Sequence, residues 1–142
     1  MLGFPMGFEV LDISGDVGIR AKGSDLKEVF VSAAEGMYSL ITDIDKVDVK
    51  KHIKVTVASY SHEGLLVAWL NELIFYFDTY YFIGKRIVIN ELTQSKIDAV
   101  VEGEDFDPLR HEKRLLVKAA TYHDLVLEDK GGLYQVDVIF DI

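Results

Sequence analysis

Residues 61–77, SHEGLLVAWLNELIFYF, contribute most to the fold that we predict for this chain. Their large apolar side chains recur at spacings of three and four residues, which is typical of a helix with one side in a core. This stripe consists of Leu66, Trp69, Leu70, Leu73, Ile74 and Phe77. Val67 and Phe75 widen it, so the helix is apolar over much of its circumference and should be deeply buried. Asn71 and Glu72 interrupt the stretch, which is too short for a bilayer span of about 20 apolar residues.

A second helical pattern covers residues 25–42, where Asp25 and Glu28 have the spacing of a capping box. Ser61 is a suitable N-cap for the helix that follows it. Alternating or β-branched segments elsewhere indicate strands. These lie at 8–13, 17–22, 53–57, 86–89, 97–102, 115–119 (continued or restarted at 121–127) and 134–142. We therefore expect an α+β fold, a two-layer sandwich with a mostly antiparallel sheet of about six or seven strands and two main helices on one face.

Length and composition limit the classes of function. The chain has 142 residues and no linker-like segment, so we expect a single domain over residues 1–142. Its net charge of −9 repels phosphates and anionic lipids, so neither strong direct nucleic-acid binding nor membrane association is expected. A basic protein partner or a cation is the more natural ligand. The absence of cysteine excludes disulfides, thiolate zinc sites and cysteine nucleophiles, and favours the cytoplasm. The apolar residues 1–8 lack the basic and long apolar regions of a signal peptide.

The chain contains neither a glycine-rich phosphate loop nor the motifs of zinc peptidases and serine hydrolases. Its four histidines are His52, His62, His111 and His123, and none has a close histidine neighbour. We therefore do not expect a histidine-rich metal site.

Carboxylates are the plentiful metal ligands of this sequence. Asp12 and Asp16 flank the first turn, and Asp141 is followed by the terminal carboxylate of Ile142. With Asp16, the chain end could form an all-oxygen pocket for a hard divalent ion such as calcium or magnesium. The alternative is a frayed, solvated terminus, although the strand-forming residues 134–140 should tie this end into the sheet.

Two further clusters have both a functional and a structural interpretation. His123 and Asp124 could form an acid–base pair, or His123 could contact a partner, but a strand-end histidine satisfied by a backbone acceptor would look the same. Lys118, in an apolar segment, could contact an anionic group or extend to solvent. His111 follows Pro108 in a polar loop over residues 103–113, where it could bind a partner or be solvated.

The aromatic residues at 75–77 and 80–82 have helical spacing and are expected mainly in the core. Any exposed portion would be a candidate protein-binding patch.

These landmarks, in this order, resemble the archease family over nearly the whole chain, from about Phe8 to Ile142. Residues 14–18, SGDVG, resemble the family's His-Thr-Ala-Asp-Ile-Gly opening, and residues 69–73, WLNEL, its central helix. The family's loop has counterparts in residues 103–104 and 110–112. Its Val-Lys-Ala-x-Thr-Tyr-His motif is similar to residues 117–124, VKAATYHD, and its ending is similar to residues 138–142. The opening histidine is replaced by Ile13, whereas Asp16 is retained, and carboxylate coordination does not need the imidazole.

The resemblance implies a cytoplasmic accessory protein and not an enzyme. Archeases assist the RtcB-type tRNA-splicing RNA ligase by promoting its guanylylation, so that the ligase turns over many times. The resemblance also implies a calcium-type site, with magnesium or manganese as alternatives, formed by Asp16, Asp141 and Ile142. By the same resemblance Lys118, and with it His123 and Asp12, are candidate contacts to the partner or its nucleotide site.

Two other functions stay open on the sequence. The first is a small metal-dependent phosphohydrolase that would use Asp16 and Asp141 for the ion and His123 for proton transfer, although no nucleophile or phosphate cradle accompanies them. The second is a general chaperone or protein-binding module that would use exposed aromatic residues near Tyr80 and Tyr81.

Overall fold

The computed structural model describes residues 7–13 and 15–142. The N-terminal segment 1–8, for which no signal peptide is predicted, lies largely outside the described residues. Ser14, in the predicted first turn, also lies outside them. The helices are α1 (Leu26–Ile41) and α2 (His62–Tyr80), with a short 3-10 turn, η1 (Ile44–Lys46). The strands are β1 (Gly7–Ile13), β2 (Asp16–Gly23), β3 (Lys51–Ala58), β4 (Phe82–Leu92), β5 (Lys96–Asp105), β6 (Ala119–Ala120), β7 (Leu127–Asp129) and β8 (Tyr134–Asp141).

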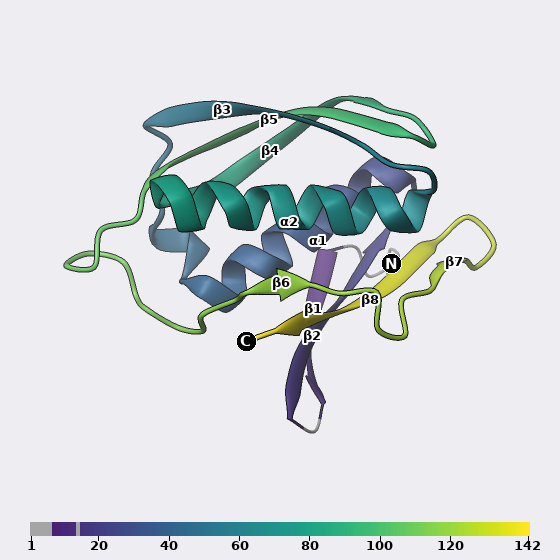
Figure 1. Ribbon diagram of the computed structural model, residues 1–142, viewed down its shortest axis with the longest axis horizontal. Coiled ribbons are helices and arrows are strands. Elements are labelled where there is room, and N and C mark those ends of the chain that lie inside the picture. Colours follow the sequence, from purple (N-terminus) through teal and green to yellow (C-terminus); the bar gives the residue numbers. More distant parts are fainter. Residues whose placement is uncertain (1–6, 14) are drawn as a thin grey trace, which may run out of the picture.

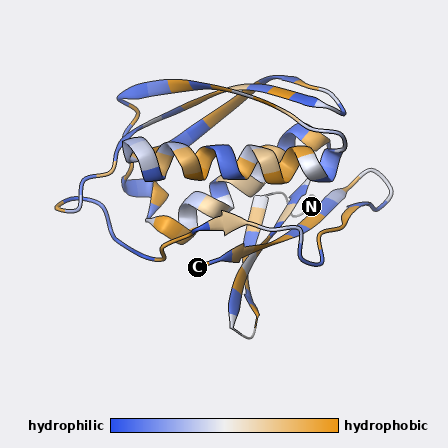
Figure 2. Ribbon diagram, viewed as in Figure 1, coloured by the Kyte–Doolittle hydropathy of each residue, from blue (hydrophilic) through white to orange (hydrophobic). Residues whose placement is uncertain are grey.

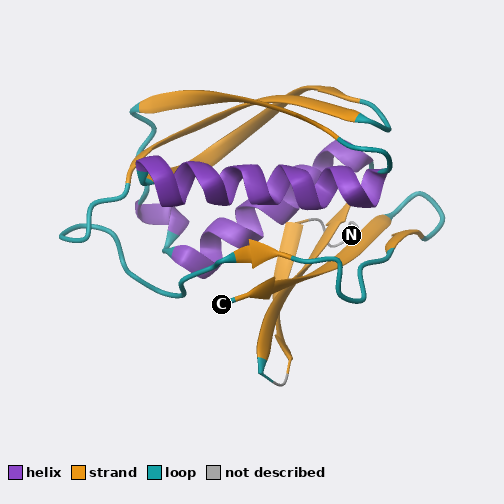
Figure 3. Cartoon of the chain, in the orientation of Figure 1, coloured by secondary structure: helices purple, strands orange, loops and turns teal. Residues whose placement is uncertain are grey.

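The two helices lie between two antiparallel sheets (Figures 1 and 3). One sheet has the order β1-β2-β8-β6, with β7 also paired to β8, and the other has the order β3-β5-β4. Helix α1 packs on β1 and β2 and also on β4, while α2 contacts β3, β4 and β5 as well as β6. The predicted α+β class and antiparallel pairing are confirmed, but the predicted single sheet with both helices on one face is replaced by two sheets that cover the helices from both sides. The strands divide into two sheets because α2 is apolar on more than one side and is covered from both.

Both helices begin at the predicted caps. The side chain of Asp25 accepts the N–H of Glu28 at 2.8 Å, and the carboxylate of Glu28 reaches back to the N–H of Ser24 at 2.7 Å. The hydroxyl of Ser61 accepts the N–H of Gly64 at 3.0 Å. Each cap satisfies a backbone donor that has no partner within its helix.

The core lies around the contact between the helices, and Figure 2 shows hydrophobic residues along both of them. Trp69 is fully buried, and its indole N–H donates to the carbonyl of Phe30 on α1 at 3.1 Å. Every residue of the predicted α2 stripe packs into this core, Phe77 being partly exposed. Among the described residues, neither helix combines the length and apolarity that crossing a membrane requires.

The strand predicted over residues 115–119 is wrong for residues 115–118, which lie outside any strand. The N–H groups of Arg114 and Leu115 donate to the carbonyls of Ile41 and Leu40 at 3.0 and 2.9 Å. These carbonyls belong to the last turn of α1, where no N–H of the same helix is available to bond to them. The segment therefore completes the end of α1, and only Ala119–Ala120 pairs as a strand.

Candidate functional site

The predicted carboxylates lie at adjoining strand ends in the sheet that contains β2 and β8. The pairing of β2 with β8 ends at Val17 and Phe140, so Asp16 and Asp141 are each the next residue beyond the last pair. Both aspartates are exposed, whereas Val17 and Phe140 face the core. The two carboxylates therefore lie at solvent-exposed ends of neighbouring strands.

The end of β8 is held by its neighbouring strands. Up to Phe140 the strand pairs with β2 on one side, and on the other side it pairs with β6 as far as its last residue, Asp141, which lies opposite Ala119. The N–H of Lys118 donates to the carbonyl of Asp141 at 2.8 Å. A frayed terminus, the alternative considered above, does not describe a strand that is paired up to Asp141.

The charge at this edge is uncompensated within the described residues. No basic side chain there lies within 4.0 Å of either Asp16 or Asp141. The same part of the chain contains no group of three or more His, Cys, Asp or Glu residues that could hold a metal.

The other predicted contacts lie around this edge but differ in orientation. Asp12 pairs with Val17 and so projects to the face opposite Asp16. Lys118 is exposed and precedes β6. His123 and Asp124 lie in an exposed turn after β6, with His123 Nε2 3.3 Å from a carboxylate oxygen of Asp124. Asp16 and Asp141 thus lie at the ends of neighbouring strands, whereas Asp12 projects to the other side of the sheet.

Sequence reasoning missed a buried cluster around Glu104. This carboxylate is only 3% exposed, at the end of β5. It accepts the N–H of Asp48 and the guanidinium of Arg110, and its other neighbour is His111 Nε2 at 3.1 Å. The prediction that His111 belongs to a solvated loop is wrong, because its ring is buried and its Nδ1 accepts the N–H of Asp107 at 2.7 Å.

The electrostatics of the cluster favour an ionised Glu104. Burial alone would raise the pKa of this carboxyl, but the hydrogen bonds from the Asp48 N–H, Arg110 and His111 outweigh it and lower the pKa to about 2. Because Nδ1 of His111 is an acceptor, Nε2 carries the proton that points to Glu104. The cluster ties residues 106–111 to the connection before β3. The short sequence separation of Glu104 from Arg110 and His111 allows these side chains to interact. No local sequence pattern, however, indicated that Glu104 and His111 are buried.

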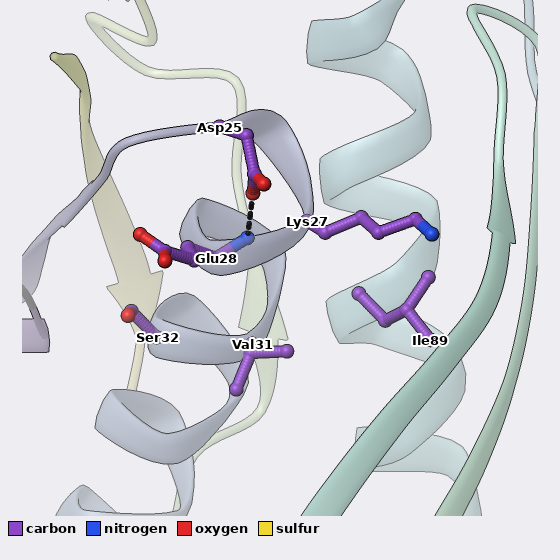
Figure 4. Close-up of a pocket in the computed structure, with 6 residues that line it drawn as sticks. All are labelled: Asp25, Lys27, Glu28, Val31, Ser32 and Ile89. Atoms are coloured by element: carbon purple, nitrogen blue, oxygen red, sulfur yellow. Dashed lines mark hydrogen bonds between the residues drawn. The ribbon is translucent and has the colours of Figure 1, made fainter.

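A shallow groove lies at the start of α1, lined by Asp25, Lys27, Glu28, Val31, Ser32 and Ile89. Figure 4 shows the Asp25 cap of α1 at this groove and Lys27 extended toward Ile89 of β4. Asp25 and Glu28 are already engaged by the helix start. The groove lies at the end of β2 opposite to Asp16, and this strand of eight residues is about 25 Å long. It is therefore separate from the carboxylate pair.

Comparison with known proteins identifies the family. The model of the archease protein family matches residues 8–142. "Protein archease" of Sulfurisphaera tokodaii is 35% identical over 136 residues, which cover 95% of this chain and 98% of that protein. A solution structure of a Methanobacterium thermoautotrophicum protein superposes with a TM-score of 0.81 at 35% identity, covering 96% of this chain and 99% of that one.

A second solved structure is more distant. An archease from Thermotoga maritima, described as a possible chaperone, is 15% identical, with a TM-score of 0.61 over 93% of this chain and 94% of that one. This likeness concerns the fold alone. Because the family model covers nearly the whole chain and relatives share about a third of its residues, the chain belongs to the archease family.

Proposed function

We propose that this protein is an accessory activator of an RtcB-type RNA ligase and that it acts through a divalent cation, calcium above all, at Asp16, Asp141 and the carboxylate of Ile142. Membership of the archease family supports the partner. The observation that supports the site is the pairing of β2 with β8 up to Val17 and Phe140, after which Asp16 and Asp141 are the next residues at neighbouring strand ends. Activation would consist of promoting guanylylation of the ligase, so that one ligase molecule turns over many times.

The residues at this edge fit a hard cation. All three groups offer oxygen atoms, which calcium, magnesium and manganese prefer over nitrogen or sulfur. A cation between Asp16 and Asp141 would remove the repulsion of two carboxylates that have no basic neighbour within the described residues. When bound there, a divalent ion supplies positive charge beside the phosphates of the ligase's nucleotide. The role of the chain is to hold the two strand ends in register and present their carboxylates at an exposed edge.

An accessory role, without catalysis by this chain, agrees with the exposure of the site. Asp16 and Asp141 lie at exposed strand ends, and the groove at the start of α1 is at the other end of β2. Catalytic sites usually enclose their substrate in a concave pocket. We place the activity in the cytoplasm, in keeping with a chain of 142 residues without cysteine.

The test is a ligation assay with purified ligase, RNA and GTP, with and without this protein. Wild-type protein should convert single-turnover ligation into multiple turnover. Asp16→Asn and Asp141→Asn, which keep side-chain size, should each abolish most of this stimulation and reduce calcium affinity in calorimetry by at least about tenfold. A one-glycine extension after Ile142 should do the same by moving the terminal carboxylate.

Asp45→Asn is the matched control, because Asp45 is also exposed but belongs to η1. It should leave both stimulation and calcium binding unchanged. Full stimulation by Asp16→Asn and Asp141→Asn would refute the role of the carboxylates, and no stimulation by the wild type would refute the partnership with the ligase.

Two rival functions are tested by simpler assays. Hydrolysis of phosphoesters by this protein alone would favour a metal-dependent phosphohydrolase. Suppression of the aggregation of unrelated proteins, without any ligase, would favour a general chaperone. The exposed aromatic residues of α2 make the second assay worth performing.

A further inference from the structure

The C-terminal half of α2 carries exposed aromatic rings that are already packed against each other. Phe75 is 49% exposed and Tyr80 58% exposed, with Tyr76 partly buried between them and the core. The ring centroids are 5.7 Å apart for Phe75–Tyr76, 6.2 Å for Phe75–Tyr80 and 5.9 Å for Tyr76–Tyr80. We call Phe75, Tyr76 and Tyr80 the aromatic face. Because each ring limits the motion of the others, little side-chain entropy remains to be lost when a partner binds.

The backbone under the aromatic face is also fixed. Helix α2 continues past Asp78 to Tyr80 and closes with Tyr81 in a left-handed conformation (φ 61°). The carbonyl of Tyr81 accepts the N–H of Phe106 at 2.7 Å. Phe106 in turn packs edge-on against Phe77 on the inner side of the helix. The rings are therefore presented by a rigid element.

Acidic side chains accompany these rings without cationic partners. Glu72 lies three and four residues before Phe75 and Tyr76, so it shares their side of the helix. Asp78 lies three residues after Phe75. Neither carboxylate has a basic group within 4.0 Å in the part of the chain that the structure describes. Desolvation by the surrounding chain raises the pKa of Asp78, although its side chain is exposed.

We propose that the aromatic face, with Glu72 and Asp78, is a docking site for an arginine-bearing segment of a protein partner. A guanidinium is planar, stacks on tyrosine and phenylalanine rings, and donates two parallel hydrogen bonds to a carboxylate. The face offers both complements within two helical turns. Within the proposed function this partner is the ligase, so the inference deepens that proposal and identifies a second contact, distinct from the carboxylates at the sheet end.

Other occupants match this face less well. Nucleic acid would bring phosphates against Glu72 and Asp78 on a chain that already carries a net charge of −9. A second copy related by a twofold axis would set the same acidic face against itself, which places like charges together. A lysine segment would supply charge but not the planar stacking surface.

A direct test uses synthetic peptides and does not need the ligase. Peptides of alternating arginine and leucine, and counterparts with lysine or glutamate in place of arginine, are titrated while NMR follows the ring signals of Phe75 and Tyr80. The arginine peptide should shift these signals and bind best, the lysine peptide more weakly, and the glutamate peptide not at all. Tyr80→Ala and Glu72→Lys should each weaken the arginine peptide by about tenfold.

Tyr60→Ala is the control, since Tyr60 is 100% exposed and precedes α2 at its other end. It should change the affinity by less than about twofold. Emission of the buried Trp69 confirms that each variant is folded. Equal binding of arginine and glutamate peptides, or unchanged affinity in Tyr80→Ala and Glu72→Lys, would overturn the inference.

The ligase then separates the two proposals. If the inference is correct, Tyr80→Ala and Glu72→Lys lose affinity for the ligase but keep calcium binding, whereas Asp16→Asn loses calcium and keeps the aromatic contact. If wild-type protein binds and stimulates the ligase and both α2 variants do so equally well, the docking site is refuted and the proposed function stands. If the wild type binds the arginine peptide but no ligase, the proposed function fails and the docking site stands.

Discussion

Removing the charge of Glu104 should destabilise the protein by an amount that depends on pH. Glu104→Gln keeps the size of the side chain and removes its ionisation. In the folded chain, burial opposes the charge, but the Asp48 N–H, Arg110 and His111 lower the pKa from an ordinary 4.5 to about 2. At about 1.4 kcal/mol for each tenfold change in an ionisation equilibrium, the ionised carboxylate contributes about 3 kcal/mol to the free energy of unfolding at pH 7.

The sign of the pH dependence follows from the direction of this change. The pKa is lower in the folded than in the unfolded chain, so the contribution is complete above pH 4.5 and is lost as the pH falls toward 2. The difference in unfolding free energy between wild type and Glu104→Gln should therefore be about 3 kcal/mol at pH 7 and close to zero near pH 2.

The assay is urea unfolding at several pH values, followed by the fluorescence of Trp69, which is the single tryptophan and is fully buried. Glu102→Gln is the control on the same strand, where Glu102 pairs with Arg86 at 3.4 Å near the surface. It should cost less than about 1 kcal/mol. A difference for Glu104→Gln that is constant from pH 7 to pH 3, or no larger than that for Glu102→Gln, would refute the reasoning.

Three further predictions concern the frame around the site. Tyr38→Phe should leave stability unchanged or raise it by about 1 kcal/mol in urea unfolding, because the buried Tyr38 hydroxyl lacks a hydrogen-bond partner in the described chain; a loss above about 1 kcal/mol would contradict this. Asn71→Ala should accelerate amide exchange at Ala120, whose N–H and carbonyl both bond the Asn71 side chain at 2.8 and 3.2 Å; unchanged exchange would argue against it. Gly103→Ala should cost at least about 3 kcal/mol in thermal unfolding, because a Cβ there would lie 2.0 Å from the carbonyl oxygen of Ile83; wild-type stability would disprove this close approach.

Local sequence patterns predicted the elements of the fold well. The spacing of apolar residues located both helices, and Asp25 and Ser61 identified where they begin. Gly131 and Gly132, in the turn between β7 and β8, have positive φ, which glycine adopts without strain. These features depend on neighbours within a few residues, so a local pattern contains the information.

Other features depend on contacts that are distant in sequence. Residues 115–117 have strand composition, yet their neighbourhood includes the end of α1, whose carbonyls take the N–H groups of Arg114 and Leu115. His111 has the sequence context of a solvated loop, yet it is buried because Glu104 and the N–H of Asp107 satisfy its ring. Neither outcome follows from hydrophobicity, since both come from backbone or buried polar groups finding distant partners.

From the sequence alone came the family resemblance, the α+β class, the two helices and a set of carboxylates at the two extremities of the chain. Only the tertiary structure decided that the strands form two sheets around the helices and that β2 and β8 are neighbours, which puts Asp16 and Asp141 at adjoining strand ends. The physical reason is that periodicity reports which side of a strand faces the core, whereas the choice of pairing partner is made by the packing of the whole chain.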